Sequence, residues 1–181
     1  MGWDIMTKIL KKCTVLALIL AVAALFLSSC GSSPKEQNEI KGLVEYKTLA
    51  ELAKAVGYTG EVKELNNPMY EVKSFLCDEE HNFGFLSGDW TIGAGGSITV
   101  SFGKGDRDDL SYRAEGEKIK SYKTEKGTEV TIYKVKKFEN HVSAEFMLNG
   151  FTFGVSLAGN DWDPSEAVKT PVLDLEAAFG K

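Results

Sequence analysis

The chain has 181 residues, of which 43% are hydrophobic and 26% are charged, and its net charge at pH 7 is −5. This length suits a single domain with a buried core. An acidic chain lacks the excess of lysine and arginine that binds a phosphate backbone, so we expect no nucleic-acid partner.

The first thirty residues have the pattern of an export signal. Three lysines precede an unbroken apolar run of thirteen residues, 15–27. A membrane-spanning helix needs about 20 apolar residues, whereas runs of about 10 to 14 are typical of signal-peptide cores. The stretch Leu27-Ser28-Ser29-Cys30 ends this run, and it resembles the lipobox of bacterial lipoproteins. In that class of proteins, the chain is cut before the cysteine, which carries a diacylglyceryl group.

The lipobox resemblance implies that residues 1–29 are a lipoprotein signal peptide. It also implies that acylated Cys30 anchors the protein to the cell membrane, facing outside the cytoplasm, because two acyl chains suffice for stable anchoring. Three lysines and one aspartate precede Cys30, a net +2, so the chain from Cys30 onward carries −7. An uncleaved transmembrane anchor and an unacylated secretory signal are the alternatives, and translation starts at Met1 or Met6.

After the signal, the sequence predicts a flexible tether over residues 30–45 and one domain over residues 46–181. The tether begins with turn-forming and charged residues, which bury too little surface to fold. Thr48 and Glu51 have the spacing of a capping box, and apolar residues then recur at helical spacing. We therefore expect a short helix that ends at Gly57.

Short segments rich in strand-forming residues follow this helix. Turn-forming residues, such as Ser87-Gly88-Asp89, separate them. Strands joined by brief turns pair antiparallel, because a parallel crossover needs a dozen or more residues. The predicted strands are 62–65, 70–77, 83–86, 90–92, 97–103, 119–123 and 128–135.

Asn149-Gly150 predicts a further hairpin, because both residues tolerate the positive φ of a type I′ turn. Its opposite surfaces differ in polarity. One carries polar side chains, including His141, Ser143 and Glu145, and is expected to be solvated or to bind a ligand. The other is apolar and pairs Leu148 with Phe151, Phe146 with Phe153, Ala144 with Val155, and Val142 with Leu157.

The C-terminal segment predicts a second short helix. Asp163-Pro164 and Thr170-Pro171 each have the pattern of a helix start, and a sparse apolar stripe runs from there to Phe179. The predicted fold class is therefore α+β. It has an antiparallel sheet of about seven strands, with a short N-terminal helix and a short C-terminal helix packed on one face.

Three stretches, ELAKAVGYTGEV, KGTEVTIYK and AEFMLNGFTFGVSLAG, occur in this order. From Thr48 to Phe179 the order of elements resembles a domain family of unknown function found in lipoproteins of Gram-positive bacteria. That family has an aromatic residue beside the hairpin turn, which Phe146 matches here. The resemblance implies no catalytic residues.

His141, Ser143 and Glu145 offer a base, a nucleophile and an acid on one strand face. Successive positions on such a face lie ~6.5 to 7 Å apart, whereas a nucleophile and its base must come within about 3 Å. The sequence also lacks the G-x-S-x-G turn that lifts a serine out of a sheet. We therefore expect no catalytic site and no enzyme activity.

Two groups of residues have the chemistry of metal ligands. Cys77 and His81 lie close in sequence, but no second ligand cluster has zinc-site spacing, and a lone cysteine is typical of a small buried hydrophobe. Asp106, Asp108 and Glu117 occupy the first, third and twelfth positions of a calcium loop. Its fifth position is a leucine and its sixth a serine, where the loop needs an oxygen ligand and a glycine. We expect no metal and no cofactor.

Three further features are interpreted as structural. The acidic cluster 160–166 complements a helix N-terminus. The glycines of 93–96 and 103–105 lack the spacing of a phosphate-binding loop. For Trp90 and Trp162 there are two interpretations: they line a carbohydrate or peptide groove, or they belong to the core. A core position is more common for a large aromatic residue in a strand pattern.

Taken together, the export signal and the lack of a catalytic set predict a non-catalytic binding or sensing domain at the cell envelope. Its partner would be an envelope protein or a small molecule. One alternative is an envelope hydrolase whose active-site residues lie far apart in sequence. Another is a carrier of an apolar ligand, which requires an apolar cavity of at least ~300 Å³.

Overall fold

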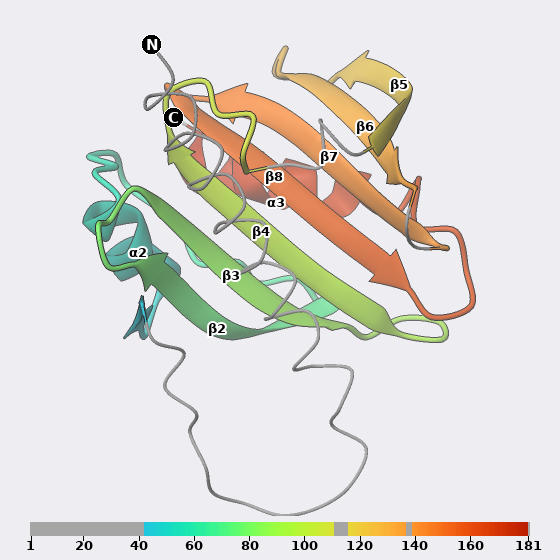
Figure 1. Cartoon of the computed structure of the whole chain (residues 1–181), viewed down its shortest axis with the longest axis horizontal. Coiled ribbons are helices and arrows are strands. Elements are labelled where there is room, and N and C mark those ends of the chain that lie inside the picture. The colour runs from blue at the N-terminus through green and yellow to red at the C-terminus, as the bar shows by residue number, and fades with distance from the viewer. Residues whose placement is uncertain (1–41, 111–115, 137–138, 181) are drawn as a thin grey trace, which may run out of the picture. The chain divides into compact units, whose positions relative to one another are not determined.

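The structure is a computed structural model, and it describes residues 42–110, 116–136 and 139–180 (Figure 1). The chain divides into two units, Met1–Glu39 and Ile40–Lys181, and all the described residues belong to the second unit. The predicted signal peptide, the lipobox and most of the predicted tether lie outside the described residues. No helix among the described residues is long and apolar enough to cross a membrane.

Eight strands in the described part of the chain form one antiparallel sheet, in the order β1-β2-β3-β4-β8-β7-β6-β5. Two meanders, β1–β4 and β5–β8, are thus joined where β4 pairs with β8. The α+β prediction is confirmed, with eight strands where about seven are predicted. The elements are β1 Leu43–Tyr46, α2 Leu49–Ala55, β2 Tyr70–Asp78, β3 Phe83–Trp90, β4 Gly96–Lys104, β5 Gly116–Lys123, β6 Glu129–Val135, β7 His141–Leu148, β8 Phe151–Gly159 and α3 Lys169–Phe179.

Helix α2 is fixed by its own sequence, as the capping-box spacing predicts. The Thr48 hydroxyl accepts a hydrogen bond from the backbone N–H of Glu51 at 3.1 Å. The Glu51 carboxylate accepts one from the backbone N–H of Lys47, also at 3.1 Å. The first bond satisfies an N–H group that a helix start leaves unpaired, and the second ties the residue before the N-cap to the first turn. Gly57 follows the helix with a φ of +85°, which ends it as predicted.

The β7–β8 hairpin is confirmed in its turn and its register. Asn149 and Gly150 have φ values of 52° and 79°, as a type I′ turn requires. The four predicted apolar pairs all occur between facing residues of the two strands.

Strand β3 corrects the prediction of a turn at Ser87-Gly88-Asp89, because it runs without a break from Phe83 to Trp90. Gly88 lies opposite Val72, at an irregularity in the pairing of β2 with β3. A Cβ atom on Gly88 would lie 2.2 Å from the carbonyl oxygen of Glu71. This glycine therefore permits a close approach of two strands and does not mark a turn.

Three other features differ from the prediction. The segment 62–65 is not a strand: it runs beside α3, where the backbone N–H of Lys63 donates to the carbonyl of Ala178 at 3.1 Å. The edge position beside β2 belongs instead to β1, so the sheet begins at Leu43, inside the predicted tether. At the other end, α3 begins at Lys169, while Asp163 caps a preceding turn by accepting from the N–H of Ser165.

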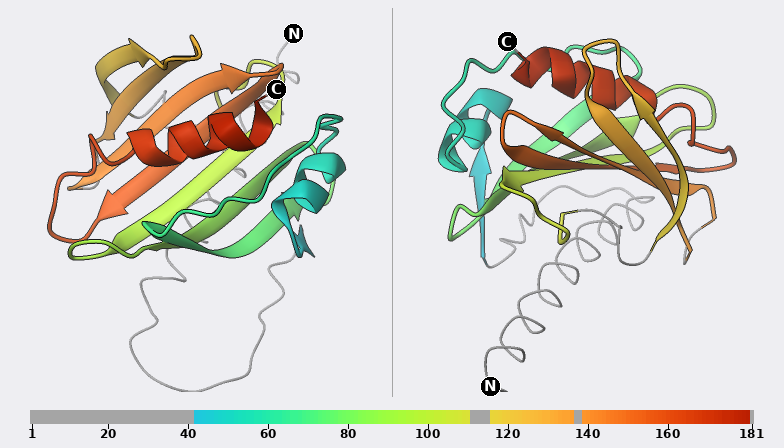
Figure 2. Two further views of the ribbon diagram at one scale, coloured as in Figure 1. Left: turned by 180° about the vertical axis from the view of Figure 1, so that it is seen from behind. Right: turned by 90° about the horizontal axis from the view of Figure 1, so that it is seen from above.

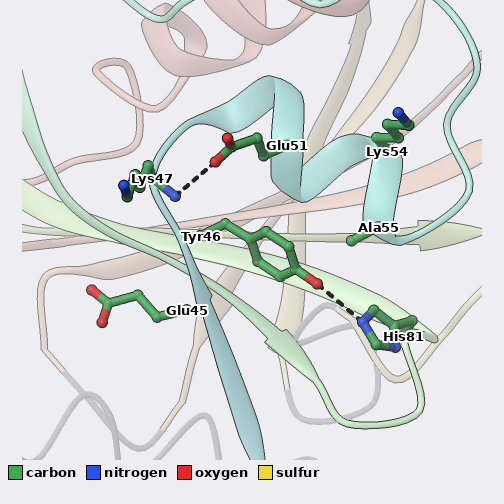
Figure 3. Close-up of a pocket in the computed structure, with 7 residues that line it drawn as sticks. All are labelled: Glu45, Tyr46, Lys47, Glu51, Lys54, Ala55 and His81. Carbon is green, nitrogen blue, oxygen red and sulfur yellow. Dashed lines mark hydrogen bonds between the residues drawn. The ribbon is translucent and has the colours of Figure 1, made fainter.

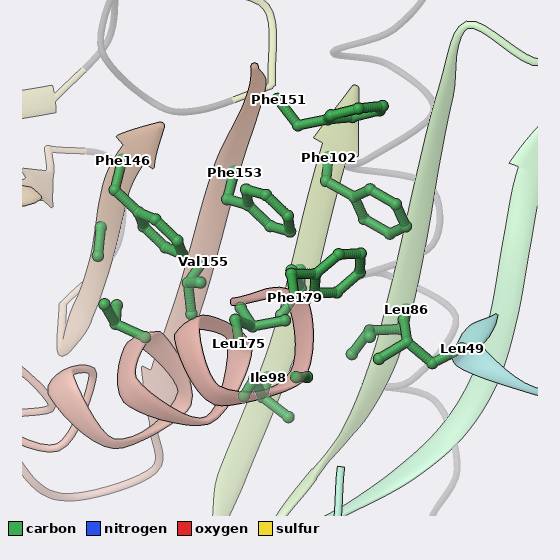
Figure 4. Packing of buried hydrophobic residues seen from close by; sticks show 14 of the residues in the cluster. Leu49, Leu86, Ile98, Phe102, Phe146, Phe151, Phe153, Val155, Leu175 and Phe179 are labelled. Carbon is green, nitrogen blue, oxygen red and sulfur yellow. The ribbon is translucent and has the colours of Figure 1, made fainter. Parts of the chain in front are cut away.

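Both helices pack on the same face of the sheet, as predicted (Figure 2). Stacked rings fill the space between α3 and the sheet (Figure 4). Phe153 stacks between Phe102 and Phe146, with centroids 5.4 and 5.2 Å away. Phe179 of α3 meets the rings of Phe102 and Phe153 edge-on, at 5.4 and 5.0 Å. Such aromatic pairs add to the stabilisation that burial alone provides.

Polar side chains also hold α3 in place. Asp174 accepts hydrogen bonds from the Tyr70 hydroxyl at 2.8 Å and from the Asn67 amide at 2.7 Å. Burial and the Asp174 carboxylate raise the pKa of Tyr70, so its hydroxyl remains a donor. Two residues further along the helix, the buried Glu176 carboxylate accepts from the Thr124 hydroxyl at 2.6 Å.

Candidate functional site

The polar residues of β7 lie on the sheet face opposite the helices, but the structure corrects the prediction that this face is simply solvated. Ser143 is 1% exposed, and its hydroxyl has no hydrogen-bond partner among the described residues. Glu145 and Thr152 are also buried. His141 bonds through Nε2 to the hydroxyl of Ser156 on β8, not to Ser143.

The chain segment after β4 covers part of this face. The Thr152 hydroxyl donates to the carbonyl of Gly105 at 2.6 Å and accepts from the backbone N–H of Arg107 at 3.1 Å. A Cβ atom on Gly154 would lie 2.0 Å from the carbonyl oxygen of Leu110, so the absence of a side chain there admits the segment. Gly154 in an alternating strand is the one sequence signal for this close approach.

The His141–Ser156 contact resembles a base and a nucleophile in distance but not in setting. Burial lowers the pKa of His141 to about 4, so the ring is neutral near pH 7. A catalytic pair also needs donors for a developing negative charge and a place for the substrate. Neither His141 nor Ser156 lies in the walls of the three hollows described below.

The residues that were weighed as possible metal ligands are not brought together. Cys77 is buried, and its thiol donates to the carbonyl of Phe83 at 3.3 Å. Burial, with a smaller contribution from Asp78, raises the pKa of the thiol to about 12, which agrees with the prediction of a buried hydrophobe. Asp106 and Asp108 lie after β4 and Glu117 in β5, with residues 111–115 outside the described residues. Among the described residues, no three His, Cys, Asp or Glu side chains form a group that would hold a metal ion.

Trp90 belongs to the core and the half-buried Trp162 packs against it, and neither lies in the walls of the three hollows described below. Trp90 lies between Tyr70 and Trp162, with ring centroids 6.2 and 5.9 Å away. The Trp162 indole donates to the carbonyl of Gly95 at 2.8 Å, which fixes the glycine-rich turn between β3 and β4. In the acidic cluster, Glu166 pairs with two lysines, which lower the pKa of its carboxyl to about 2.

A first hollow, the Tyr46 recess, opens where β1 leads into α2 (Figure 3). It has a volume of about 700 Å³. The Tyr46 hydroxyl and His81 Nε2 lie 3.0 Å apart across it, and His81 occupies the β2–β3 turn with a φ of 56°. The recess is lined by Glu45, Tyr46, Lys47, Glu51, Lys54, Ala55 and His81.

Two further hollows adjoin at the C-terminal end of α2 and form what we call the Tyr58 groove. Their volumes are about 690 and 420 Å³, and they share residues 57–60 as a common wall. Lys54 lies in the smaller hollow and also in the Tyr46 recess. The recess and the groove therefore adjoin each other around α2.

The wall of the Tyr58 groove is rigid. Tyr58 is 8% exposed, and its hydroxyl donates to the carbonyl of Phe179 at 2.6 Å. The Asn149 amide donates to the same carbonyl at 2.6 Å and to the Tyr58 hydroxyl at 3.1 Å. The Tyr58 ring meets Phe151 and Phe179 edge-on. These contacts join the segment after α2, the β7–β8 turn and the end of α3, so the groove is formed before any ligand binds.

No family model matches this chain, and searches of curated proteins and of solved structures give no match either. The predicted resemblance to a lipoprotein domain family therefore stays a prediction. The recess and the groove could not be predicted from the sequence, because their walls come from segments that are far apart in the chain. The only local signal was the pair of glycines, Gly57 and Gly60, around Tyr58.

Proposed function

We propose that this protein is a membrane-anchored lipoprotein whose domain binds a ligand or a partner protein outside the cytoplasm, without catalysis. The observation that carries the anchoring is the lipobox at Leu27–Cys30, and only twelve residues, 31–42, separate its cysteine from the start of β1 at Leu43. This spacing would hold the domain close to the membrane surface. The Tyr46 recess and the Tyr58 groove adjoin α2, which follows β1 directly.

Binding without catalysis is favoured by the geometry around α2. The Tyr46 recess and the Tyr58 groove are open hollows with charged residues in their walls. The space between α3 and the sheet is filled by aromatic rings, which argues against a carrier of an apolar ligand. The ligand of the binding domain would therefore be polar or charged.

The anchoring is tested by growing cells with an alkyne-bearing palmitate analogue and tagging the label on the purified protein. We expect labelled protein in the membrane fraction, with Cys30 as its first residue in mass spectra. Cys30→Ser abolishes the label, whereas the matched variant Cys77→Ser keeps it, because Cys77 is buried in the domain. Label retained in Cys30→Ser, or a native protein that keeps residues 1–29, contradicts the proposal.

An envelope hydrolase is the second candidate, and the His141–Ser156 contact is the observation that favours it. Screening the purified protein against ester and peptidoglycan substrates tests this candidate. Turnover that Ser156→Ala abolishes and Ser143→Ala leaves intact would establish the hydrolase. The absence of turnover, or turnover equal in both variants, removes the contact as support for it.

A further inference from the structure

The Tyr58 groove carries an excess of positive charge in a domain whose overall charge is negative. Lys54, Lys63 and Lys104 lie in its walls, and Glu61 is the one carboxylate that the described residues contribute there. The groove therefore has a local charge of +2, whereas the chain from Cys30 onward carries −7. A positive hollow on an acidic protein attracts anions to one place and repels them elsewhere.

The three lysines are available to a ligand. None of them forms an ion pair with a described residue, while Lys73, Lys120, Lys123 and Lys169 elsewhere in the domain do so. A fourth lysine lies near the rim: Nζ of Lys126 is 3.5 Å from the position that a Cβ atom would take on Gly180, a wall residue. The charges come from α2, the segment after it, β4 and the β5–β6 turn, so they surround the hollow from several sides.

The kind of positive group indicates the kind of anion. Lysine binds phosphates as a point charge, whereas bidentate binding of a carboxylate or a phosphate needs the planar fork of arginine. The one described arginine, Arg107, is paired with Asp109 outside the groove. Because Lys54 lies in one hollow and Lys63 and Lys104 lie in the other, the arrangement fits a ligand with successive charged groups better than a single ion.

We propose that the Tyr58 groove binds a ligand with repeated phosphate groups, either a soluble phosphate polymer or the phosphate headgroups of anionic lipids. This inference rests on the proposed function, because it names the ligand class of a binding domain. The wall formed by Tyr58 and Asn149 holds the groove open, and the lysines supply the attraction. The Tyr58 hydroxyl and the Asn149 amide already donate hydrogen bonds within the protein, so the lysine charges are the groups that select the ligand.

The test uses the full protein purified from its own cells in a neutral detergent. Its affinity is measured by calorimetry for linear inorganic polyphosphate and, separately, for water-soluble short-chain phosphatidylglycerol. The groove variant is Lys63→Glu with Lys104→Glu. The matched control is Lys118→Glu with Lys134→Glu, two exposed lysines on β5 and β6 that make the same change in net charge.

We expect at least one probe to bind, and the groove variant to weaken that binding about tenfold or more. The control should weaken it less than about twofold at 0.1 M salt, because charges beyond a Debye length of about 10 Å are screened. The probe that binds identifies the source of the phosphate. Equal losses in both double variants overturn the proposal, as does the absence of binding of both probes. An unfolding temperature equal to that of the native protein shows that each variant is folded.

The two proposals fail separately. Loss of acylation at Cys30 would contradict the anchoring and leave phosphate binding to the groove intact. If neither probe binds to correctly acylated protein, the proposal of a phosphate ligand is contradicted, and the proposal of a membrane-anchored binding domain is unaffected.

Discussion

The two faces of the sheet use their side chains differently. The face under the helices is an apolar layer in which Phe179 of α3 meets the rings of two strands. The opposite face carries polar side chains that hold a chain segment through hydrogen bonds, as Thr152 does with Gly105. The comparison indicates that burial is the main source of stability on one face, whereas on the other the polar groups mostly compensate for their own desolvation.

The largest expected effect concerns the helix-covered face. Phe179→Ala removes a fully buried ring from between α3 and the sheet, and we expect the free energy of unfolding to fall by about 3–5 kcal/mol. Chemical denaturation measures this loss. Leu173→Ala is the control on the same helix, because Leu173 is 48% exposed and should change stability by less than about 0.5 kcal/mol. Equal losses would show that aromatic packing is not what holds α3.

The next prediction concerns acid stability on the opposite face. Burial lowers the pKa of His141 from 6.5 to about 4, so the unfolded chain takes up this proton at a higher pH than the folded one. Stability from His141 is therefore complete above about pH 6.5, falls as the pH drops towards 4, and is constant below that. The total loss is about 3 kcal/mol at most.

The measurement is the free energy of unfolding between pH 7 and pH 4. His141→Gln should show a smaller loss than the native protein over this range, since other titrating groups contribute to both. If His141→Gln keeps the native slope, burial of the His141 ring does not control acid stability.

A smaller effect is expected at α2, which packs on the helix-covered face but is held by its cap. Thr48→Ala removes the hydroxyl that accepts from the N–H of Glu51, and we expect a loss of about 1 kcal/mol. Thr48→Ser should restore most of the stability, because serine caps equally well. A serine variant as weak as the alanine variant would show that the methyl group, and not the cap, matters.

Features that depend on neighbouring residues could be predicted from the sequence, and features that depend on distant segments could not. The α2 cap and the Asn149–Gly150 turn are set by residues close together in the chain, and both are confirmed. Gly88 was misread because its role depends on Glu71 in another strand. β1 was missed because four residues become a strand only when β2 is beside them.

The candidate site follows the same rule. The Tyr58 groove is formed by the segment after α2, β4, the β7–β8 turn and the end of α3, so no local sequence pattern predicts it. The His141–Ser156 contact was within reach of the sequence. The predicted register already placed Ser143 opposite Ser156, and His141 is then a diagonal neighbour of Ser156.

The smallest effects separate two serines on the polar face. The hydroxyl of Ser143 is buried and has no partner among the described residues, so Ser143→Ala removes an uncompensated polar group and should leave stability unchanged or raise it by up to about 1 kcal/mol. Ser156→Ala instead removes the partner of His141 and should lower stability by about 1 kcal/mol. The stability of each variant is compared with that of the native protein through their denaturation midpoints. A loss in Ser143→Ala as large as that in Ser156→Ala would mean that both hydroxyls are bonded, and that the polar face stabilises the fold more than its geometry indicates.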